Sequence, residues 1–138
     1  ATPLLMASQE GQLECVRLLL EAGAAMDQAK ENGATPLLIA SQEGQLECAQ
    51  LLLEASVAVN QAKQGGATPL YIACQNGYLE CVRLLLEASA AINQADEEGT
   101  TPLYIACYQG HLECVRLLLD ASAVVVVDQA YNNGATPL

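Results

Sequence analysis

Residues 34–48 read ATPLLIASQEGQLEC, and closely similar stretches occupy residues 1–15, 67–81 and 100–114. The phrase Thr-Pro-Leu within them appears once more at Thr136, so its five copies lie 33, 33, 33 and 35 residues apart. A fixed period of this size indicates a stacked-repeat protein. Each unit is too small to bury its own apolar face, so the core must form between neighbouring units.

One unit contains the signals for two short helices. Thr35 can cap a helix through its hydroxyl, and Pro36 suits the first helical position, where its missing N–H costs nothing. We predict a first helix over 36–43 and a second over 46–55, separated by a break at Gly44-Gln45. The other units predict first helices over 3–10, 69–76 and 102–109, and second helices over 13–22, 79–88 and 112–121.

Polar residues form one narrow stripe along each second helix. In the helix over 46–55 the stripe is Glu47, Gln50 and Glu54, and the other residues are apolar. A helix with so narrow a polar face is covered on several sides, as stacking between two neighbouring units would do. Elsewhere the stripe contains an i,i+3 ion pair, which gives three of the five basic residues a structural role: Glu14–Arg17, Glu80–Arg83 and Glu113–Arg116.

A cap position follows each second helix and holds Gly23, Ser56, Ser89 or Ser122. Glycine adopts the left-handed cap conformation freely, whereas serine adopts it at a cost. An extended segment and a turn then lead to the next Thr-Pro-Leu. In the last unit this segment carries Val124–Val127 where the others have two residues. The insertion is either a neutral lengthening of a loop or an apolar finger that contacts a partner.

The chain has 138 residues, the length of one domain, and a net charge of −11 with only five basic residues. Nucleic acids and anionic membranes both require a basic surface, so both are disfavoured as partners. The excess of negative charge favours a protein partner with a basic surface. No apolar run approaches the roughly 18 residues of a membrane span.

The six cysteines are predicted to be thiols in a reducing compartment, and we expect an intracellular, cytoplasmic protein. A disulfide or metal site that joins Cys74 to Cys81, or Cys107 to Cys114, is the alternative. Buried thiols behave as small hydrophobes. Four cysteines share one apolar position of the second helix and are expected to be buried: Cys15, Cys48, Cys81 and Cys114.

No catalytic group is apparent, and the chain is predicted not to be an enzyme. The only histidine, His111, has no readable nucleophile or paired carboxylate beside it, so a structural role is favoured. The ten glycines punctuate the repeats and form no phosphate-binding loop. We therefore predict no catalytic residue, no cofactor and no metal ligand.

The 33-residue unit of two helices and a turn, opened by Thr-Pro-Leu, resembles the ankyrin repeat. The resemblance covers nearly the whole chain and implies an all-α repeat solenoid, in which four helix pairs stack and short β-hairpin-like turns join them. The units are 1–33, 34–66, 67–99 and 100–134, with the start of a fifth at 135–138. Both ends show the apolar pattern of the middle units instead of polar caps, so we expect a segment of a longer array.

The chain departs from the ankyrin pattern at polar positions. The turn aspartate survives only as Asp96, and the second histidine of the pattern survives only as His111, with Gln12, Gln45 and Tyr78 in the other units. The first histidine, which ties neighbouring turns together in the family, is replaced by Leu5, Leu38, Tyr71 and Tyr104. Tyrosine can supply part of that contact and leucine cannot, so we expect altered hydrogen bonds between units in an unchanged fold.

The resemblance implies a non-catalytic protein–protein interaction scaffold, which binds its partner on a concave face made by the turn tips and the first helices. Tyr108 is the strongest candidate, because tyrosine is favoured at interfaces and its equivalents are all glutamine. The alternative is a structural spacer with no partner on this segment. The uncapped ends also predict head-to-tail self-association. The candidate partner-binding residues are Glu31, Asn32, Gln42, Glu43, Gln64, Gln75, Asn76, Glu97, Glu98, Tyr104, Tyr108 and Gln109.

Overall fold

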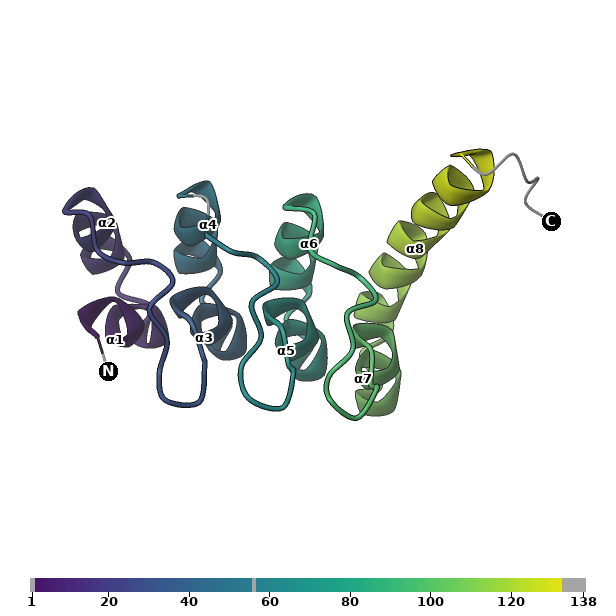
Figure 1. Ribbon diagram of the computed structural model, residues 1–138, viewed down its shortest axis with the longest axis horizontal. Helices are drawn as coiled ribbons and strands as arrows, with labels where there is room; N and C mark the ends of the chain where they lie inside the picture. Colours follow the sequence, from purple (N-terminus) through teal and green to yellow (C-terminus); the bar gives the residue numbers. More distant parts are fainter. Residues whose placement is uncertain (1, 56, 133–138) are drawn as a thin grey trace.

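The computed structural model of the chain describes residues 2–55 and 57–132, with side chains as far as Ser122. Within these residues, helices form four pairs that stand in one row (Figure 1). First helices contact first helices along the row and second helices contact second helices, which gives two layers. The expected all-α repeat solenoid is confirmed. The helices are α1 (Pro3–Glu10), α2 (Leu13–Glu21), α3 (Pro36–Glu43), α4 (Leu46–Glu54), α5 (Pro69–Asn76), α6 (Leu79–Glu87), α7 (Pro102–Gln109) and α8 (Leu112–Asn132).

The four first helices begin and end at the predicted residues. A threonine hydroxyl caps each one by accepting a hydrogen bond from the backbone N–H three residues later, as between Thr68 and Tyr71 at 3.1 Å. Proline follows at the first helical position. A left-handed glycine ends each helix with φ between +70° and +74°, a conformation that costs glycine little: Gly11, Gly44, Gly77 and Gly110.

Three of these glycines also make room for a side chain of the next repeat. A Cβ on Gly77 would lie 2.6 Å from the His111 ring, and one on Gly44 would lie 3.0 Å from the Tyr78 ring. From this place His111 Nε2 donates a hydrogen bond to the Gln75 carbonyl at 3.0 Å. Gln45 Nε2 donates to the Gln9 carbonyl at 3.2 Å in the same way. Gln45 therefore retains a hydrogen bond between repeats at a position where the sequence departs from the ankyrin pattern.

The second helices bury their apolar side chains between the first helices and the neighbouring repeats. Leu52, Leu85 and Leu118 are fully buried at equivalent positions. The first three second helices end one residue before the predicted ends. The predicted i,i+3 ion pairs form on the exposed side, with N–O distances of 4.0, 3.5 and 3.9 Å. Because they are exposed, they add little to stability.

Hydrogen-bonded turns join the helix pairs and project from the same side of the row (Figure 1). Each turn closes on a backbone bond such as Lys63 N to Ala67 O, 3.0 Å long. The turns also bond to one another, because Gln64 N donates to Asn32 O at 2.7 Å and Glu97 N donates to Gly65 O at 2.9 Å. The turn tips therefore form a continuous rim along the row.

The last second helix is much longer than predicted. We expected it to end at residue 121 and the Val124–Val127 segment to be extended, but α8 continues to Asn132. By the repeat pattern we also expected a turn at Tyr131, Asn132 and Asn133; this is wrong for Tyr131 and Asn132, which are helical, and Asn133 lies outside the described residues. At the equivalent site after α6, Ser89 takes φ +65°. That conformation is strained for serine, whereas helix continuation through Ser122 avoids it.

Thiol burial differs from the prediction at one position. Cys48, Cys81 and Cys114 are buried, but Cys15, at the same place in the first repeat, is exposed. All six cysteines are free, so neither suggested disulfide forms. Cys74 is buried and Cys107, its equivalent in the last repeat, is exposed. Burial thus depends on a repeat's neighbours, since the exposed members lie in the first and last repeats.

Candidate partner-binding surface

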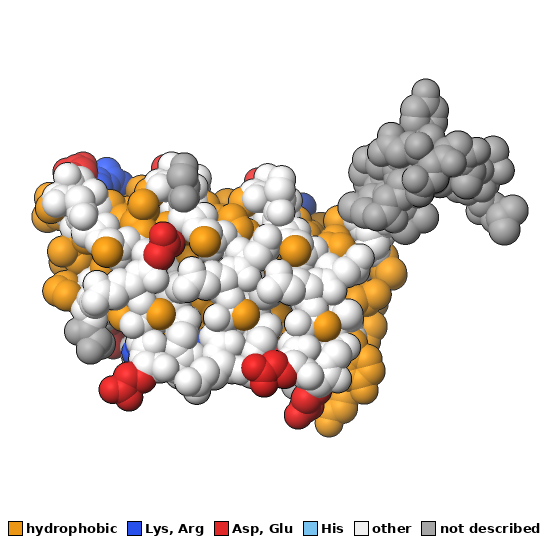
Figure 2. All heavy atoms as spheres, in the orientation of Figure 1, with side chains coloured by type: hydrophobic (Ala, Val, Ile, Leu, Met, Phe, Trp, Pro, Cys, Tyr) orange, Lys and Arg blue, Asp and Glu red, His pale blue; other side chains and the backbone are white. Residues whose placement is uncertain are grey.

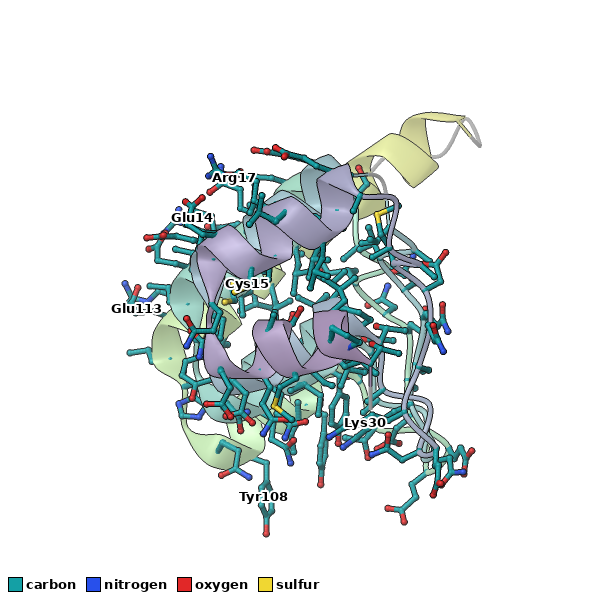
Figure 3. All side chains as sticks on the ribbon, turned by 90° about the vertical axis from the view of Figure 1, so that its left-hand side faces the viewer. Glu14, Cys15, Arg17, Lys30, Tyr108 and Glu113 are labelled. Atoms are coloured by element: carbon teal, nitrogen blue, oxygen red, sulfur yellow. The ribbon has the colours of Figure 1, made fainter. Side chains whose placement is uncertain are left out.

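The candidate surface runs along the underside of the first helices toward the turn tips. Figure 3, viewed along the row, shows Tyr108 pointing away from the helices at this underside and Lys30 at the foot of the turns. The labelled ion-pair residues Glu14 and Arg17 lie on the opposite, outer side of the molecule (Figure 3). The two predicted sets of candidates, turn tips and helix ends, therefore border one surface.

The rim of turn tips carries negative charge. Acidic side chains appear at intervals along the lower edge of the row (Figure 2). In the third turn, backbone N–H groups of Thr100 and Glu98 each donate to Asp96 Oδ1 at 2.9 Å. These bonds, first the one from Thr100, lower the pKa of the Asp96 carboxyl. Asp96 is thus held ionised beside Glu97 and Glu98, which are exposed.

Tyr71 of α5 lies beside Asp96 of the rim. Its side chain is only 8% exposed. Burial, and then the hydrogen bond with Asp96, raise the pKa of the Tyr71 hydroxyl. The Tyr71 hydroxyl is therefore close enough to the Asp96 carboxylate for each to shift the pKa of the other. Leu5 and Leu38 are buried at the same position in the first two repeats.

Tyr104 and Tyr108 are the most prominent exposed aromatic side chains of the described region. They lie one turn apart on α7 and are 61% and 74% exposed. Residues four apart on a helix share a face, so the two rings form one aromatic patch. Tyr104 is equivalent to Tyr71, yet it is exposed, because α8 continues as a helix to Asn132 and the described residues contain no fourth turn that covers it.

Eleven of the twelve candidate residues are exposed, and Gln75 is half-buried. Three of the exposed ones already serve the scaffold. Asn32 Oδ1 accepts from Ala34 N at 3.0 Å, and Asn76 Nδ2 donates to the Gln42 carbonyl at 3.0 Å. Gln64 Nε2 donates to the Glu31 carbonyl at 3.4 Å. The remaining candidates whose side chains have no such role here are Glu31, Gln42, Glu43, Glu97, Glu98, Tyr104, Tyr108 and Gln109.

The surface offers exposed side chains for contact with a partner. The described residues contain no group of side chains that could hold a metal ion. None of the described helices is long and apolar enough to span a membrane. The family model for ankyrin repeats, in its three-copy form, matches residues 1–63 and 56–129. The chain belongs to the ankyrin-repeat family. No individual curated protein matched the sequence.

Ankyrin repeats are generally protein–protein interaction modules and are typically non-catalytic. The family does not identify a partner for this chain. Within this chain, the turn tips and the ends of the first helices vary between units while the stacking positions repeat.

Four large apolar residues that the sequence pattern did not identify as exposed lie at the two ends of the row. Met6 is 51% and Leu18 63% exposed in the first repeat, and Leu112 is 58% and Leu119 50% exposed in the last. Hydrophobic side chains gather at the left and right edges of the molecule (Figure 2). Their location in the first and last units of the sequence could have predicted that they are exposed.

Proposed function

We propose that this ankyrin-repeat protein is a scaffold that binds a basic segment of another protein along its underside. The observation that carries the proposal is the exposed Tyr104–Tyr108 patch on the same surface as the acidic turn tips. Tyrosine supplies rigid contact area at interfaces. The carboxylates of Glu97 and Glu98 would attract lysine and arginine and speed their association.

The charge balance supports the same partner. The net charge is −11, and three of the five basic residues lie on the second helices in ion pairs. An acidic partner would meet repulsion from the whole molecule, whereas a basic one would be attracted to it. The attraction should weaken as salt is added, because exposed charges are screened.

The test is selection of binding peptides from a random library against the whole chain, followed by affinity measurements. Tyr108→Gln introduces the residue that the other repeats carry, so the fold is expected to persist. We expect it to weaken selected peptides about tenfold or more, the size of an interface hot spot. Glu97→Gln should weaken them less and reduce the salt dependence. Glu80→Gln, on the outer side, is the matched control and should change nothing.

The alternative, a structural spacer, predicts a different outcome. Selected peptides would then show no preference for lysine or arginine, and Tyr108→Gln and Glu80→Gln would have the same effect. That result would remove the proposed binding surface.

We also propose head-to-tail self-association through the ends of the row. The observation that favours it is the exposure of Met6 and Leu18 at one end and of Leu112 and Leu119 at the other. Burying apolar area stabilises a complex by roughly 25 cal/mol per Å2. Sedimentation over a range of concentrations tests the proposal, and a strict monomer at high concentration would contradict it.

A further inference from the structure

The negative charge of the turn rim is concentrated in one of its three turns, which are residues 30–33, 63–66 and 96–99. The third turn contains three consecutive carboxylates: Asp96, Glu97 and Glu98. The second turn contains Lys63 and no acidic residue, and the first contains one charge of each sign, on Lys30 and Glu31. The rim therefore changes from basic to strongly acidic between its second and third turns.

Lysine and aspartate occupy one equivalent position of the turns. Lys30, Lys63 and Asp96 each open their turn, and the backbone N–H of each donates to the carbonyl four residues later, at 2.9, 3.0 and 2.9 Å. The closing bond is thus the same in all three turns, and the charge at this position changes sign in the third. Such a difference changes what the rim attracts without changing how its turns are closed.

Contacts between the turns fix the spacing of these charges. A Cβ built on Gly33 would lie 3.2 Å from Lys63 Cα, and one built on Gly66 would lie 2.8 Å from Asp96 Cα. Each turn therefore rests on a glycine of the turn before it. Lys63 and the carboxylates of the third turn are held one repeat apart on a continuous backbone.

Three of these charged side chains are available to a partner. All three ion pairs of the described residues use an arginine of a second helix, so Lys63 has no acidic partner among those residues. Lys63 is half-buried, and Glu97 and Glu98 are exposed. Asp96 is instead used within its turn, where Oδ1 accepts from the N–H groups of Glu98 and Thr100. A partner would therefore meet the ammonium of Lys63 and the carboxylates of Glu97 and Glu98.

The same side of the molecule carries the tyrosine proposed above as an anchor. In the view along the row, Lys30 lies at the foot of the turns and Tyr108 at the underside of the first helices (Figure 3). Tyr108 is 74% exposed and belongs to α7, the helix that follows the third turn. The acidic turn and the aromatic side chain thus lie in the same part of the underside, and Lys63 lies one repeat before them.

We propose that the basic segment bound here also carries one carboxylate, which meets Lys63, while its lysine or arginine residues meet Glu97 and Glu98. This charge pattern, which rests on the binding function proposed above, also gives the partner a register. Neighbouring repeats stand about 8–10 Å apart, the usual distance between packed helices. An extended chain advances about 3.3 Å per residue. The acidic residue of the segment should therefore lie about three residues from its basic ones.

The change of sign along the rim favours this pattern over an entirely basic segment. A basic side chain opposite Lys63 would be repelled, whereas a carboxylate there is attracted. A carboxylate opposite Glu97 or Glu98 would be repelled in turn. Because like charges across an interface are penalised, the rim distinguishes the correct register of a segment from a register shifted by one repeat.

The test begins with the peptides selected from a random library against the whole chain. We expect most of them to contain aspartate or glutamate about three residues from lysine or arginine. Lys63→Gln should weaken such a peptide about threefold, the effect of one exposed ion pair. Replacing the acidic residue of the peptide by its amide should weaken binding to the native chain equally, and should remove the effect of Lys63→Gln.

Lys30→Gln is the matched control, because it removes the same charge from the same position of the first turn. It should change the affinity less than about twofold, since exposed charges more than about 10 Å from their partners are largely screened. Neither lysine is in an ion pair of the described residues, so both variants are expected to fold, as circular dichroism would verify.

Exchange of the two charges is the decisive measurement. Lys63→Glu should bind the selected peptide more weakly than the native chain does. A peptide with lysine in place of its acidic residue should prefer Lys63→Glu to the native chain, by about threefold or more. If the exchanged pair binds no better than the mismatched pairs, the contact with Lys63 is wrong.

The remaining outcomes separate the charge pattern from the binding function. Peptides that are basic throughout, and that respond equally to Lys63→Gln and Lys30→Gln, would overturn the charge pattern; the binding surface would stand if Tyr108→Gln still weakened them. Peptides that are insensitive to Tyr108→Gln and to both lysine variants would overturn the binding surface and the charge pattern together. A library that yields no binder would do the same.

Discussion

Replacing Gly66 by alanine should show how strongly the turn rim holds neighbouring repeats together. Gly66 has φ +92°, and a Cβ there would lie 2.7 Å from Glu97 N and 2.8 Å from Asp96 Cα. These are backbone atoms of the next turn and cannot move away as a flexible side chain could. The hydrogen bond from Glu97 N to Gly65 O, 2.9 Å long, crosses the same contact.

Two effects add up in Gly66→Ala. Alanine in a left-handed conformation costs about 1–2 kcal/mol. Loss of the hydrogen bond between the turns costs about 0.5–1.5 kcal/mol more. We therefore expect the free energy of unfolding to fall by about 2–3 kcal/mol.

Gly99→Ala is the matched control. Gly99 is at the same place in the third turn, with φ +84° and no heavy atom within 4 Å of the added Cβ. It shares the conformational cost, and both variants change the unfolded chain equally. In urea unfolding followed by circular dichroism, Gly99→Ala should lose about 1 kcal/mol less of the free energy of unfolding than Gly66→Ala loses. Equal losses would refute the role assigned to the rim.

Three further predictions concern the cysteine and histidine side chains. Burial raises the pKa of the Cys74 thiol from 9.0 to about 12, so the folded state binds this proton more tightly than the unfolded state does. The free energy of unfolding should therefore fall as the pH rises from 9 toward 12. In Cys74→Ser, which introduces the residue found at positions 8 and 41, the free energy of unfolding measured with urea should fall less across that range. Native thiol labelling should be fast at Cys15 and Cys107 and slow at the four buried cysteines, and fast labelling of Cys81 would contradict the packing. His111→Ala should lower the free energy of unfolding by about 1 kcal/mol through the lost bond to Gln75 O, 3.0 Å long, whereas His111→Gln should retain most of it, because Gln45 makes the equivalent bond.

The sequence predicted the first helices to the residue because their ends are determined locally. Thr68 and Pro69 begin a helix, and Gly77 ends it, through contacts within a few residues. Repetition multiplied this evidence, since the same signals recur in each unit. The i,i+3 ion pairs were also predictable, because helix geometry alone brings such residues together.

The end of α8 could not be predicted in this way. Ser89 and Ser122 both follow Leu-Leu-Leu, an acidic residue and Ala, yet one ends a helix and the other lies within one. The chain after Ser89 is held by the preceding repeat, where Asn60 Oδ1 accepts from Ala91 N at 2.8 Å and the Asn60 carbonyl accepts from the Gln94 side chain at 3.3 Å. Such long-range bonds decide between two local conformations, and the periodic pattern does not show them.

The binding surface was predictable in outline, but its available residues were not. Variation between units identified the exposed positions. The folded structure is needed to show that Asn32 and Asn76 form hydrogen bonds within the scaffold, and that Tyr71 is buried while Tyr104 is exposed. Tyr71 and Tyr104 are both followed by Ile-Ala-Cys, so the difference arises from what covers each ring.

Cys15 and Cys48 show that two residues in the same local sequence can differ in burial. Both follow Gln-Leu-Glu in a second helix, so any window of local sequence assigns them the same environment. Cys48 is 2% exposed because α1 and α2 stand in front of it, and Cys15 is exposed because no repeat of this chain precedes it. In a solenoid a side chain's burial therefore belongs to the junction between two repeats.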